Sequence, residues 1–326
     1  MDRCKSTRRA DVDREMRAAH LRTRAMQAPM PCISAVDLVA RVLFEEITAE
    51  GGEAILLKGA SFASTLYEDD EAPRLSVDVD LLVPAGALEV VASVLHRRGY
   101  FASGSRARGD HATTWRREGL PAVDVHDTLG GLRAPPERVW KALRKHRRPL
   151  QVAGGSIPTF DLPALALHVA VHATQHGQAT GRTITDLQRA LVRIDDADWC
   201  LARELARDLD GLDSFATGLR LVPAGRELAE RLGIPPVDSA IAAARAENAS
   251  GRARLLAHVS DARGLSARLW WIRWAIVPPR VVMREWYPDQ PLGTAYIVRR
   301  PLRVVMRTPR AMRELKRVRR ATRDRG

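Results

Sequence analysis

The stretch SVDVDLLV, residues 76–83, decides the fold of this chain. Side chains of a strand alternate between its two faces, so the two acids, Asp78 and Asp80, share one face. The other face carries the apolar residues Val77, Val79 and Leu81. Pro84 ends the pattern. Two neighbouring carboxylates repel each other, and burial strengthens the repulsion, so the pair requires a cation or a shared proton.

The segment before this strand has the pattern of a strand, a tight turn and a helix. Residues 54–57 form a short apolar run that predicts a buried strand. Lys58 and Gly59 follow it, and residues 60–67 have helical spacing. A helix start offers free N–H groups to an anion, and glycine lets the anion approach the backbone closely. The junction is therefore a candidate phosphate site, although an ordinary tight turn explains Gly59 as well.

A second strand with acids on one face is predicted downstream. Residues 122–129, AVDVHDTL, alternate so that Asp124 and His126 face the same way. Carboxylate oxygens suit Mg²⁺, which keeps several waters and takes further oxygens from phosphate. Asp124 would join Asp78 and Asp80 in a two-metal site. Taken alone, the D-x-D pattern is more typical of the solvated face of a strand, and the metal site is favoured only together with Lys58, Gly59 and Asp124.

The chain changes character near residues 150–160. Before this point predicted strands and helices alternate. After it, Asp161 is a predicted N-cap, and helical patterns continue to about residue 260. We therefore expect an α+β fold in four parts. The parts are a basic N-terminal arm (1–30), a mixed-sheet domain (31–155), a helical domain (156–265) and a Trp- and Arg-rich C-terminal segment with a basic tail (266–326).

The composition is that of a globular protein that works in a reducing compartment. Its 326 residues are 45% hydrophobic, which suffices for two packed domains. Three widely separated cysteines exclude a disulfide framework and a CxxC metal site, and they fit a cytoplasmic location. No apolar run is long enough to predict a transmembrane segment, and the N-terminus lacks an apolar signal region. Nothing in the sequence indicates the oligomeric state.

The net charge of +13 is concentrated at the two ends of the chain. Residues 299–326 contain twelve Lys and Arg against two acids, and residues 1–30 contain eight against four. Basic ends can bind nucleic acid, acidic lipid or an acidic partner. Because Arg far outnumbers Lys throughout, a solvated tail from an Arg-rich coding background is an equal alternative. The tail is nevertheless the better candidate for a polyanion contact than the aromatic segment before it.

That aromatic segment gathers tryptophans among arginines: Trp270, Trp271, Trp274 and Trp286. Two functional interpretations are a nucleic-acid stacking surface and a membrane-surface helix. Pro278 and Pro279 interrupt any long helix. We favour packing of these aromatics in the core.

The series LLKGASFASTLY (56–67), RLSVDVDLLV (74–83) and VDVH (123–126) resembles the uncharacterised nucleotidyltransferase family of the DNA polymerase β-like superfamily. It also resembles toxin-type nucleotidyltransferases of abortive-infection systems. The resemblance covers roughly residues 33–195. It implies a polymerase β-like nucleotidyltransferase domain with a mixed sheet, followed by a mostly helical domain.

The resemblance also implies a role for each matching residue. Asp78, Asp80 and Asp124 would hold Mg²⁺, or Mn²⁺ in its place, against a nucleoside triphosphate such as ATP. The nucleotide-binding positions would be Lys58, Gly59, Ala60, Ser61, Arg74 and Ser76. Ala60 departs from the family, which usually has Gly or Ser there, so the phosphate contact falls to backbone groups and Ser61. Lys58 and Arg74 are explained equally well as surface ion-pair partners.

Histidines and one further acid are candidate substrate or supporting residues. His126 would contact substrate or orient Asp124, and we favour the supporting role. His168, His172 and His176 lie on one helix face, but no His-Glu-x-x-His pattern supports zinc. We expect His168 to be structural and His172 or His176 to face the base or acceptor. Asp186 matches a family aspartate, and a salt bridge explains it as well as a substrate contact does.

The sequence therefore predicts transfer of a nucleoside monophosphate from an NTP to a hydroxyl, with release of pyrophosphate. Asp124 is the candidate base for that hydroxyl. The acceptor is open among tRNA, a protein and a small molecule or peptide. The competing hypothesis is a non-catalytic protein of the same fold that binds RNA or a partner through its basic tail.

Overall fold

A computed structural model describes most of the chain. The described residues are 34–68, 74–103, 112–177, 181–236, 238–262, 264–277 and 294–324, with only the backbone of 294–305 and 323. The predicted N-terminal arm (1–30), Trp286 and the two prolines at 278 and 279 lie outside these residues.

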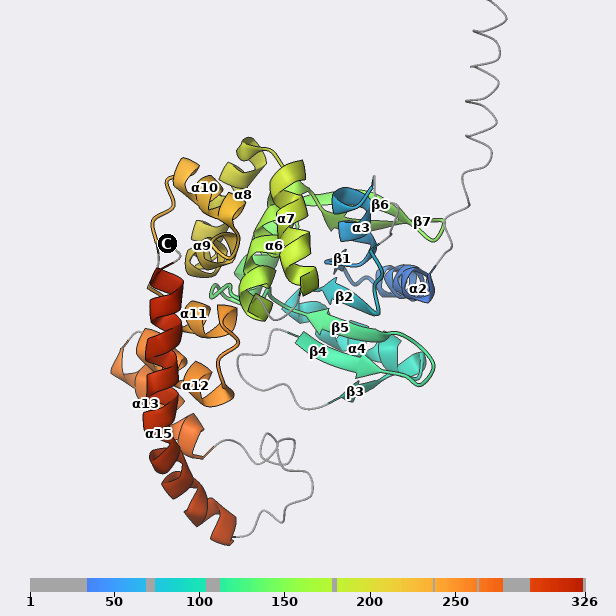
Figure 1. The fold of residues 1–326 in the computed structure, drawn as a ribbon. Coiled ribbons are helices and arrows are strands. Elements are labelled where there is room, and N and C mark those ends of the chain that lie inside the picture. The colour runs from blue at the N-terminus through green and yellow to red at the C-terminus, as the bar shows by residue number, and fades with distance from the viewer. Residues whose placement is uncertain are drawn as a thin grey trace, which may run out of the picture. The chain divides into compact units, whose positions relative to one another are not determined.

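A mixed sheet of seven strands is the centre of the first half (Figure 1), in the order β3-β4-β5-β2-β1-β7-β6. The bounds are β1 Ile55–Leu56, β2 Asp78–Leu82, β3 Phe101–Ser103, β4 Ala112–Arg116, β5 Ala122–His126, β6 Arg147–Val152 and β7 Gly155–Phe160. β5 pairs with β2 and β7 with β1 in parallel, and the other pairs are antiparallel. The expected α+β fold with a mixed sheet is confirmed.

The parallel pair β2 and β5 places the acid-bearing faces side by side. Asp80 lies opposite Asp124 in the register of the two strands. The alternate apolar residues face a separate core on the other side of the sheet, formed by Val79, Leu81, Val123 and Val125 with α2 and α4. Val77 differs from the expectation, because it precedes β2 and is 70% exposed. The strand thus begins at the first acid.

Helices cover both faces of the sheet. The bounds are α2 Ala35–Ala49, α3 Ala60–Leu66, a 3-10 turn Ala85–Ala87, α4 Leu88–Arg97 and α5 Pro136–Leu143. One core joins α2 and α4 to the sheet. The larger core joins strand residues such as Ile55 and Leu82 to α3, α5 and the helices that follow. This larger core lies on the face that carries the acids.

The predicted helical half begins after the last strand. Asp161 caps the first helix, because its side chain accepts a hydrogen bond from the Ala164 N–H. The bounds are α6 Leu162–His176, α7 Gly181–Arg193, α8 Asp196–Asp208, α9 Leu212–Leu219, α10 Pro223–Arg231, α11 Ala240–Ala246 and α12 Gly251–Asp261. The hairpin of β6 and β7 was not predicted, and it extends the sheet to Phe160. The four-part domain division stays a prediction.

The C-terminal part consists of helices α13, Leu265–Ile276, and α15, Thr294–Arg323. α15 runs beside α11 and α12 (Figure 1), and its buried residues Ala311, Leu315 and Val318 pack there. The basic tail is therefore helical, and one face of it packs on the helices before it around Leu315 and Val318.

The expected core packing of Trp270, Trp271 and Trp274 is wrong. No residue of α13 is fully buried, because apolar side chains surround the helix on all sides and only some of them meet α12 and α15. Trp271 stacks on His258 of α12 with ring centroids 4.1 Å apart. Within the described part of the chain, no helix is both long and apolar enough to cross a membrane.

Candidate functional site

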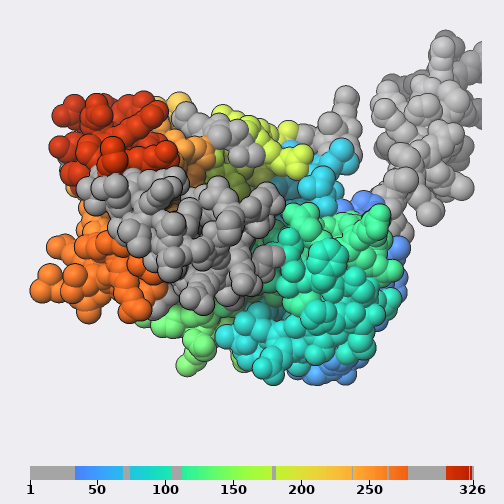
Figure 2. Space-filling model, turned by 90° about the horizontal axis from the view of Figure 1, so that it is seen from below, coloured from blue at the N-terminus to red at the C-terminus, as the bar shows by residue number. Residues whose placement is uncertain are grey.

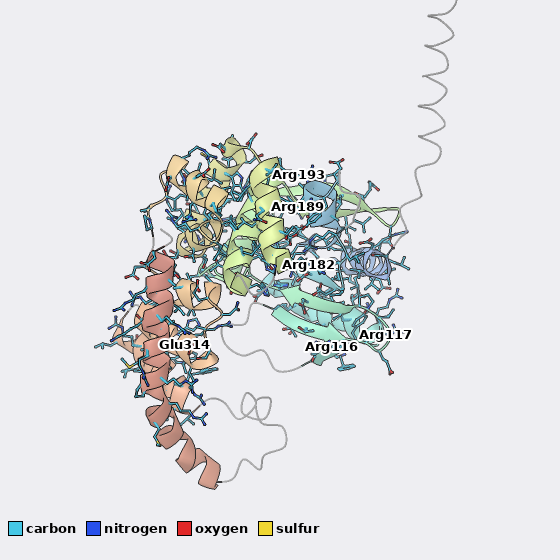
Figure 3. The ribbon with its side chains drawn as sticks, in the orientation of Figure 1. Arg116, Arg117, Arg182, Arg189, Arg193 and Glu314 are labelled. Atoms are coloured by element: carbon cyan, nitrogen blue, oxygen red, sulfur yellow. The ribbon has the colours of Figure 1, made fainter. Side chains whose placement is uncertain are left out.

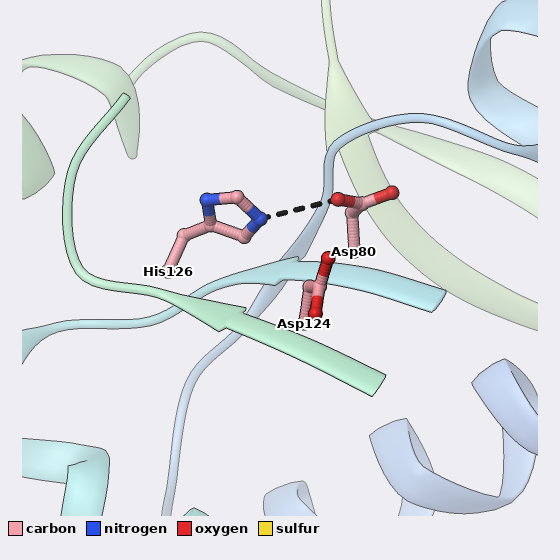
Figure 4. A group of neighbouring side chains, drawn as sticks. All are labelled: Asp80, Asp124 and His126. Atoms are coloured by element: carbon pink, nitrogen blue, oxygen red, sulfur yellow. Dashed lines mark hydrogen bonds and ion pairs between the residues drawn. The ribbon is translucent and has the colours of Figure 1, made fainter. Parts of the chain in front are cut away.

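Three side chains from the neighbouring strands β2 and β5 converge on the face of the sheet that meets the larger core (Figure 4). One ligand atom each of Asp80, Asp124 and His126 lie within 4.8 Å of one another. Strand alternation aligns Asp124 and His126, and the parallel register sets both beside Asp80. His126 Nε2 lies 3.1 Å from Asp80 Oδ1. The sequence predicted this convergence of Asp80 with Asp124, and the structure adds the imidazole.

Asp80 is the most enclosed member of the group. Its side chain is 1% exposed, and Lys58 Nζ lies 2.7 Å from Oδ1. Burial alone would raise the pKa of Asp80, but the charge of Lys58 and the hydrogen bond from His126 hold that pKa well below its ordinary value. The carboxylate is therefore anionic. Its other oxygen, Oδ2, is buried and has no hydrogen-bond partner among the described residues.

The other two acids differ in their surroundings. Asp124 accepts a hydrogen bond of 2.6 Å from Thr114 Oγ1, across the β4–β5 pairing. This bond fixes the orientation of one carboxylate oxygen. Asp78 is half-buried at the start of β2. Burial raises its pKa, and the negative charges of Asp80 and Asp124 raise it further. Asp78 is thus electrostatically coupled to the cluster, but it is not a member of the 4.8 Å group.

The Lys58–Gly59 junction lies beside the start of β2. Gly59 has φ of 62°, in the left-handed region that glycine adopts without strain. A Cβ on Gly59 would lie 3.4 Å from Ser76 Oγ, so the two residues flank the same space. Ser61 points elsewhere: it is fully buried, and its Oγ shares a 2.5 Å hydrogen bond with Thr159 Oγ1 of β7. The space next to Gly59 is accordingly bordered by backbone, including that of the half-buried Ala60, and by the Ser76 hydroxyl.

Arg74 and Asp186 form a buried ion pair. Both Arg74 Nε and Nη2 donate to the Asp186 carboxylate at 2.9 Å, and the side chains are 7% and 1% exposed. Tyr67 OH donates to the same carboxylate at 2.6 Å. Burial and this hydrogen bond raise the pKa of Tyr67 to about 12, so the phenol stays protonated. The pair joins the segment before β2 to helix α7, and a triphosphate contact by Arg74 stays a prediction.

The three histidines of α6 form a column that begins beside the acid cluster. His168 is buried against Phe62 and Phe160, as expected of a structural residue. Burial, followed by the charge of Lys58, lowers the pKa of His168 to about 3. The same two causes lower the pKa of His172 and of His176. All three rings are therefore neutral at physiological pH. Because Lys58 acts on each of them, this face of α6 is turned toward the cluster.

Sequence reasoning did not single out Thr114 or Tyr67. Thr114 follows from the antiparallel pairing of β4 with β5, which no local pattern reveals. Tyr67 ends helix α3 and reaches Asp186, which is more than 100 positions away in the sequence. Arg189, labelled on α7 in Figure 3, stacks on the Tyr67 ring at 4.0 Å. The contacts of Tyr67 depend on how α7 packs against α3, so only the tertiary structure reveals them.

The residues present fit a divalent cation. The donor set combines two carboxylates and an imidazole nitrogen, which together suit Mn²⁺ and related ions as well as a hydrated Mg²⁺. A buried anionic oxygen without a partner is costly unless a cation or donor meets it. Asp80 Oδ2 is such an oxygen.

The structure thus combines a mixed sheet, with paired acids on β2 and β5, and the helices that follow it. A family model described as uncharacterised nucleotidyltransferase matches residues 7–224, more than half of the chain. The chain belongs to this nucleotidyltransferase family. No curated protein matches it.

Several solved structures are similar at low scores. ANT(2'')-Ia in complex with adenylyl-2''-tobramycin has 10% identity and a TM-score of 0.40, over 53% of this chain and 98% of that chain. The lincomycin-bound lincosamide antibiotic adenylyltransferase LnuA has 15% identity and a TM-score of 0.35, over 48% and 96%. An antigenic nucleotidyltransferase-like protein from Paracoccidioides brasiliensis has 15% identity and a TM-score of 0.35, over 61% and 93%. These scores carry no conclusion about substrate.

Proposed function

We propose that the protein is an enzyme that transfers a nucleoside monophosphate from an NTP to a hydroxyl acceptor and releases pyrophosphate. The observation that carries the proposal is the convergence of Asp80, Asp124 and His126, together with the buried Asp80 Oδ2, which has no hydrogen-bond partner among the described residues. Membership of a nucleotidyltransferase family supports it independently. Cytoplasmic location belongs to the same proposal, because this chemistry uses the cellular NTP pool.

Asp78, Asp80 and Asp124 are the proposed metal ligands, for Mg²⁺ or Mn²⁺. A bound divalent ion would neutralise triphosphate charge and polarise the α-phosphate. Lys58 holds Asp80 ionised and fixes one of its oxygens, so the other is left for a cation. His126 steadies Asp80 from the β5 side. Asp78 has a raised pKa, which a cation beside the cluster would lower again.

The proposed phosphate contact is the space bordered by Gly59 and Ser76. A glycine in the left-handed region exposes its backbone to an incoming anion, and Ser76 Oγ lies at the edge of the same space. Ala60 contributes only backbone. Ser61 supports the turn from inside, through Thr159, rather than facing the anion. Arg74 positions this segment by anchoring it to Asp186.

In the proposed reaction the acceptor oxygen forms a bond to the α-phosphorus while the bond to pyrophosphate breaks. The acceptor proton leaves to a base, for which Asp124 is the candidate. Thr114 holds one oxygen of Asp124 and so aims the other. His172 and His176 line the α6 face on the same side and are neutral, so they can donate or accept hydrogen bonds from base or acceptor.

The test is transfer of label from each α-labelled NTP, ATP first, in the presence of Mg²⁺ or Mn²⁺ and fractions of RNA, protein and small molecules. We expect one fraction to be labelled by the wild type and not by Asp80→Asn. Glu89→Gln is the matched control, because Glu89 is an exposed acid of α4, which packs on the opposite face of the sheet. Equal labelling by Asp80→Asn and wild type would refute the site, and metal-independent labelling would refute the cofactor.

A further inference from the structure

A groove of about 1000 Å³ lies between the start of α12 and one face of α15, remote in sequence from the acid cluster. Its lining is basic: Arg252 comes from α12, and Arg307, Arg310, Arg313 and Arg317 come from α15. In Figure 2 the red atoms of α15 lie at the surface beside the orange atoms of the helices before it. The five lining arginines are exposed, so the groove is open to solvent.

Glu314 is the one acid among the lining residues, and its carboxylate forms hydrogen bonds that connect the two helices of the groove. Its carboxylate accepts hydrogen bonds from the Ser250 N–H at 2.8 Å and from Ser250 Oγ at 2.6 Å. Ser250 is the N-cap of α12, so Glu314 ties α15 to the start of that helix. Figure 3 labels Glu314 at this position on α15. One carboxylate cannot neutralise five guanidinium groups, and the groove keeps a surplus of positive charge.

The groove arginines differ from several other arginines of the protein in having no salt bridge to an acid among the described residues. Arg41, Arg98, Arg133 and Arg231 each form a salt bridge with a nearby acid. On α15 itself, Arg319 pairs with Asp238. None of the five groove arginines forms a salt bridge with an acid in the described ranges, and all five are exposed. An arginine-rich coding background explains the abundance of arginine, whereas the fold places five of these arginines on a single concave surface with one acid.

We infer that this groove binds the phosphate backbone of a nucleic acid strand. From Arg307 to Arg317 the helix rises by roughly 15 Å, and a strand in a duplex presents a phosphate about every 3.4 Å, so several phosphates fall within reach. The guanidinium group donates two parallel hydrogen bonds to phosphate oxygens. A nucleic acid strand can enter a concave surface between two helices. A flat lipid bilayer would contact only the raised edges of that surface.

The groove adjoins the end of the histidine column. Asn248 Nδ2, two residues before the α12 N-cap, donates to the His176 carbonyl oxygen at 3.0 Å. Gly177 packs so closely on Ala246 of α11 that a Cβ there would overlap its carbonyl. The charge of Arg254 on α12 acts on His176, as do the charges of Lys58 and Asp80. The segment just before α12 thus contacts the C-terminal end of α6, where the histidine column ends.

The test is equilibrium binding of a fluorescein-labelled oligouridylate, and of the matching oligothymidylate, to the full chain at increasing salt. The groove variant is Arg310→Gln with Arg317→Gln, which leaves the buried face of α15 intact. For single strands, the slope of the logarithm of the binding constant against the logarithm of the salt concentration becomes shallower by about 0.7 for each phosphate that the protein no longer neutralises. The double variant should therefore have a slope that is shallower by about 1.4, and it should bind roughly tenfold more weakly. The variant Arg310→Lys with Arg317→Lys should keep most of the slope.

The matched control is Arg138→Gln with Arg144→Gln, which removes the same charge from exposed positions at α5. Control and wild type should bind alike. An unchanged slope in the groove variant, or an equal loss in the control, would overturn the inference. So would vesicles of anionic phospholipid whose binding falls with the groove variant while oligonucleotide binding does not. The assay contains no NTP, so its outcome is independent of whether the chain transfers nucleotides.

Discussion

The polar interior between the sheet and helices α6 and α7 contrasts with the arginine groove between α12 and α15. In the interior, Asp80 is paired with Lys58, and Asp186 with Arg74, at distances of 2.9 Å or less. In the groove, five exposed arginines share one committed acid. Both regions are built from charged side chains, but the interior pairs its charges with each other and the groove leaves its arginines exposed to solvent.

The difference follows from solvent. A buried charge must be compensated by the protein, since water cannot reach it, and this fixes its partners and geometry. An exposed guanidinium is solvated and needs no partner, so it stays available to a mobile polyanion and is sensitive to salt. The interior is therefore suited to short-range chemistry and the groove to long-range attraction. The predictions below test that division, from the largest expected effect to the smallest.

Asp80→Asn should abolish nucleotide transfer and leave oligonucleotide binding unchanged. The substitution keeps the shape of the side chain but removes the anion that Lys58 and His126 hold in place. We expect a loss on the order of 10³ in turnover, the size typical of removing one preorganised electrostatic contact. Turnover with labelled NTP and oligonucleotide anisotropy measure the two effects. Parallel loss of both would mean that the two regions are not separate.

Asp186→Ala should destabilise the fold strongly. It leaves Arg74 buried without its bidentate partner, which costs about 3–5 kcal/mol. Tyr67→Phe removes only one hydrogen bond to the same carboxylate and should cost about 1 kcal/mol. Urea unfolding of both variants gives the free energies. If both variants lost the same small free energy of unfolding, the Arg74–Asp186 pair would contribute no more than an exposed ion pair.

His126→Asn should weaken metal binding by about 10- to 100-fold, whether His126 is a ligand or orients Asp80. The readout is the free Mn²⁺ signal in electron paramagnetic resonance, titrated without turnover. His96→Asn is the control, because His96 is an exposed histidine of α4. If both variants bind Mn²⁺ as the wild type does, the imidazole is not part of the metal site.

The buried, neutral His168 should make stability fall as the medium becomes acidic. The unfolded chain takes up the proton near pH 6.5, whereas the folded chain resists until about pH 3. Between these values the unfolded state binds more protons, so stability declines by about 1.4 kcal/mol per pH unit from this group as pH falls. His168→Leu should flatten the slope in urea unfolding between pH 7 and pH 5. An unaltered slope would place the proton uptake elsewhere.

The site could be predicted largely from the sequence because its parts are local patterns. The alternation of residues 76–83 and 122–129 predicts which side chains share a strand face, and the parallel register then brings Asp80 and Asp124 together. The β6–β7 hairpin was missed because Arg147–Val152 reads as polar and Gly154-Gly155 as a linker. Its partner β1 lies about 100 residues upstream, so no local signal marks it.

By itself the sequence determined the period-two strands, the capped helix after Asp161 and the charge of the C-terminus. Only the tertiary structure decided the partners of those charges. In the folded protein Arg74 pairs with Asp186, and Ser61 points inward to Thr159. The tryptophans of α13 are half-buried, and the arginines of α15 lie around the N-cap of α12. Local patterns arise from backbone geometry within a few residues. Whether a charge is paired, buried or free depends on segments that are distant in the chain and meet only on folding.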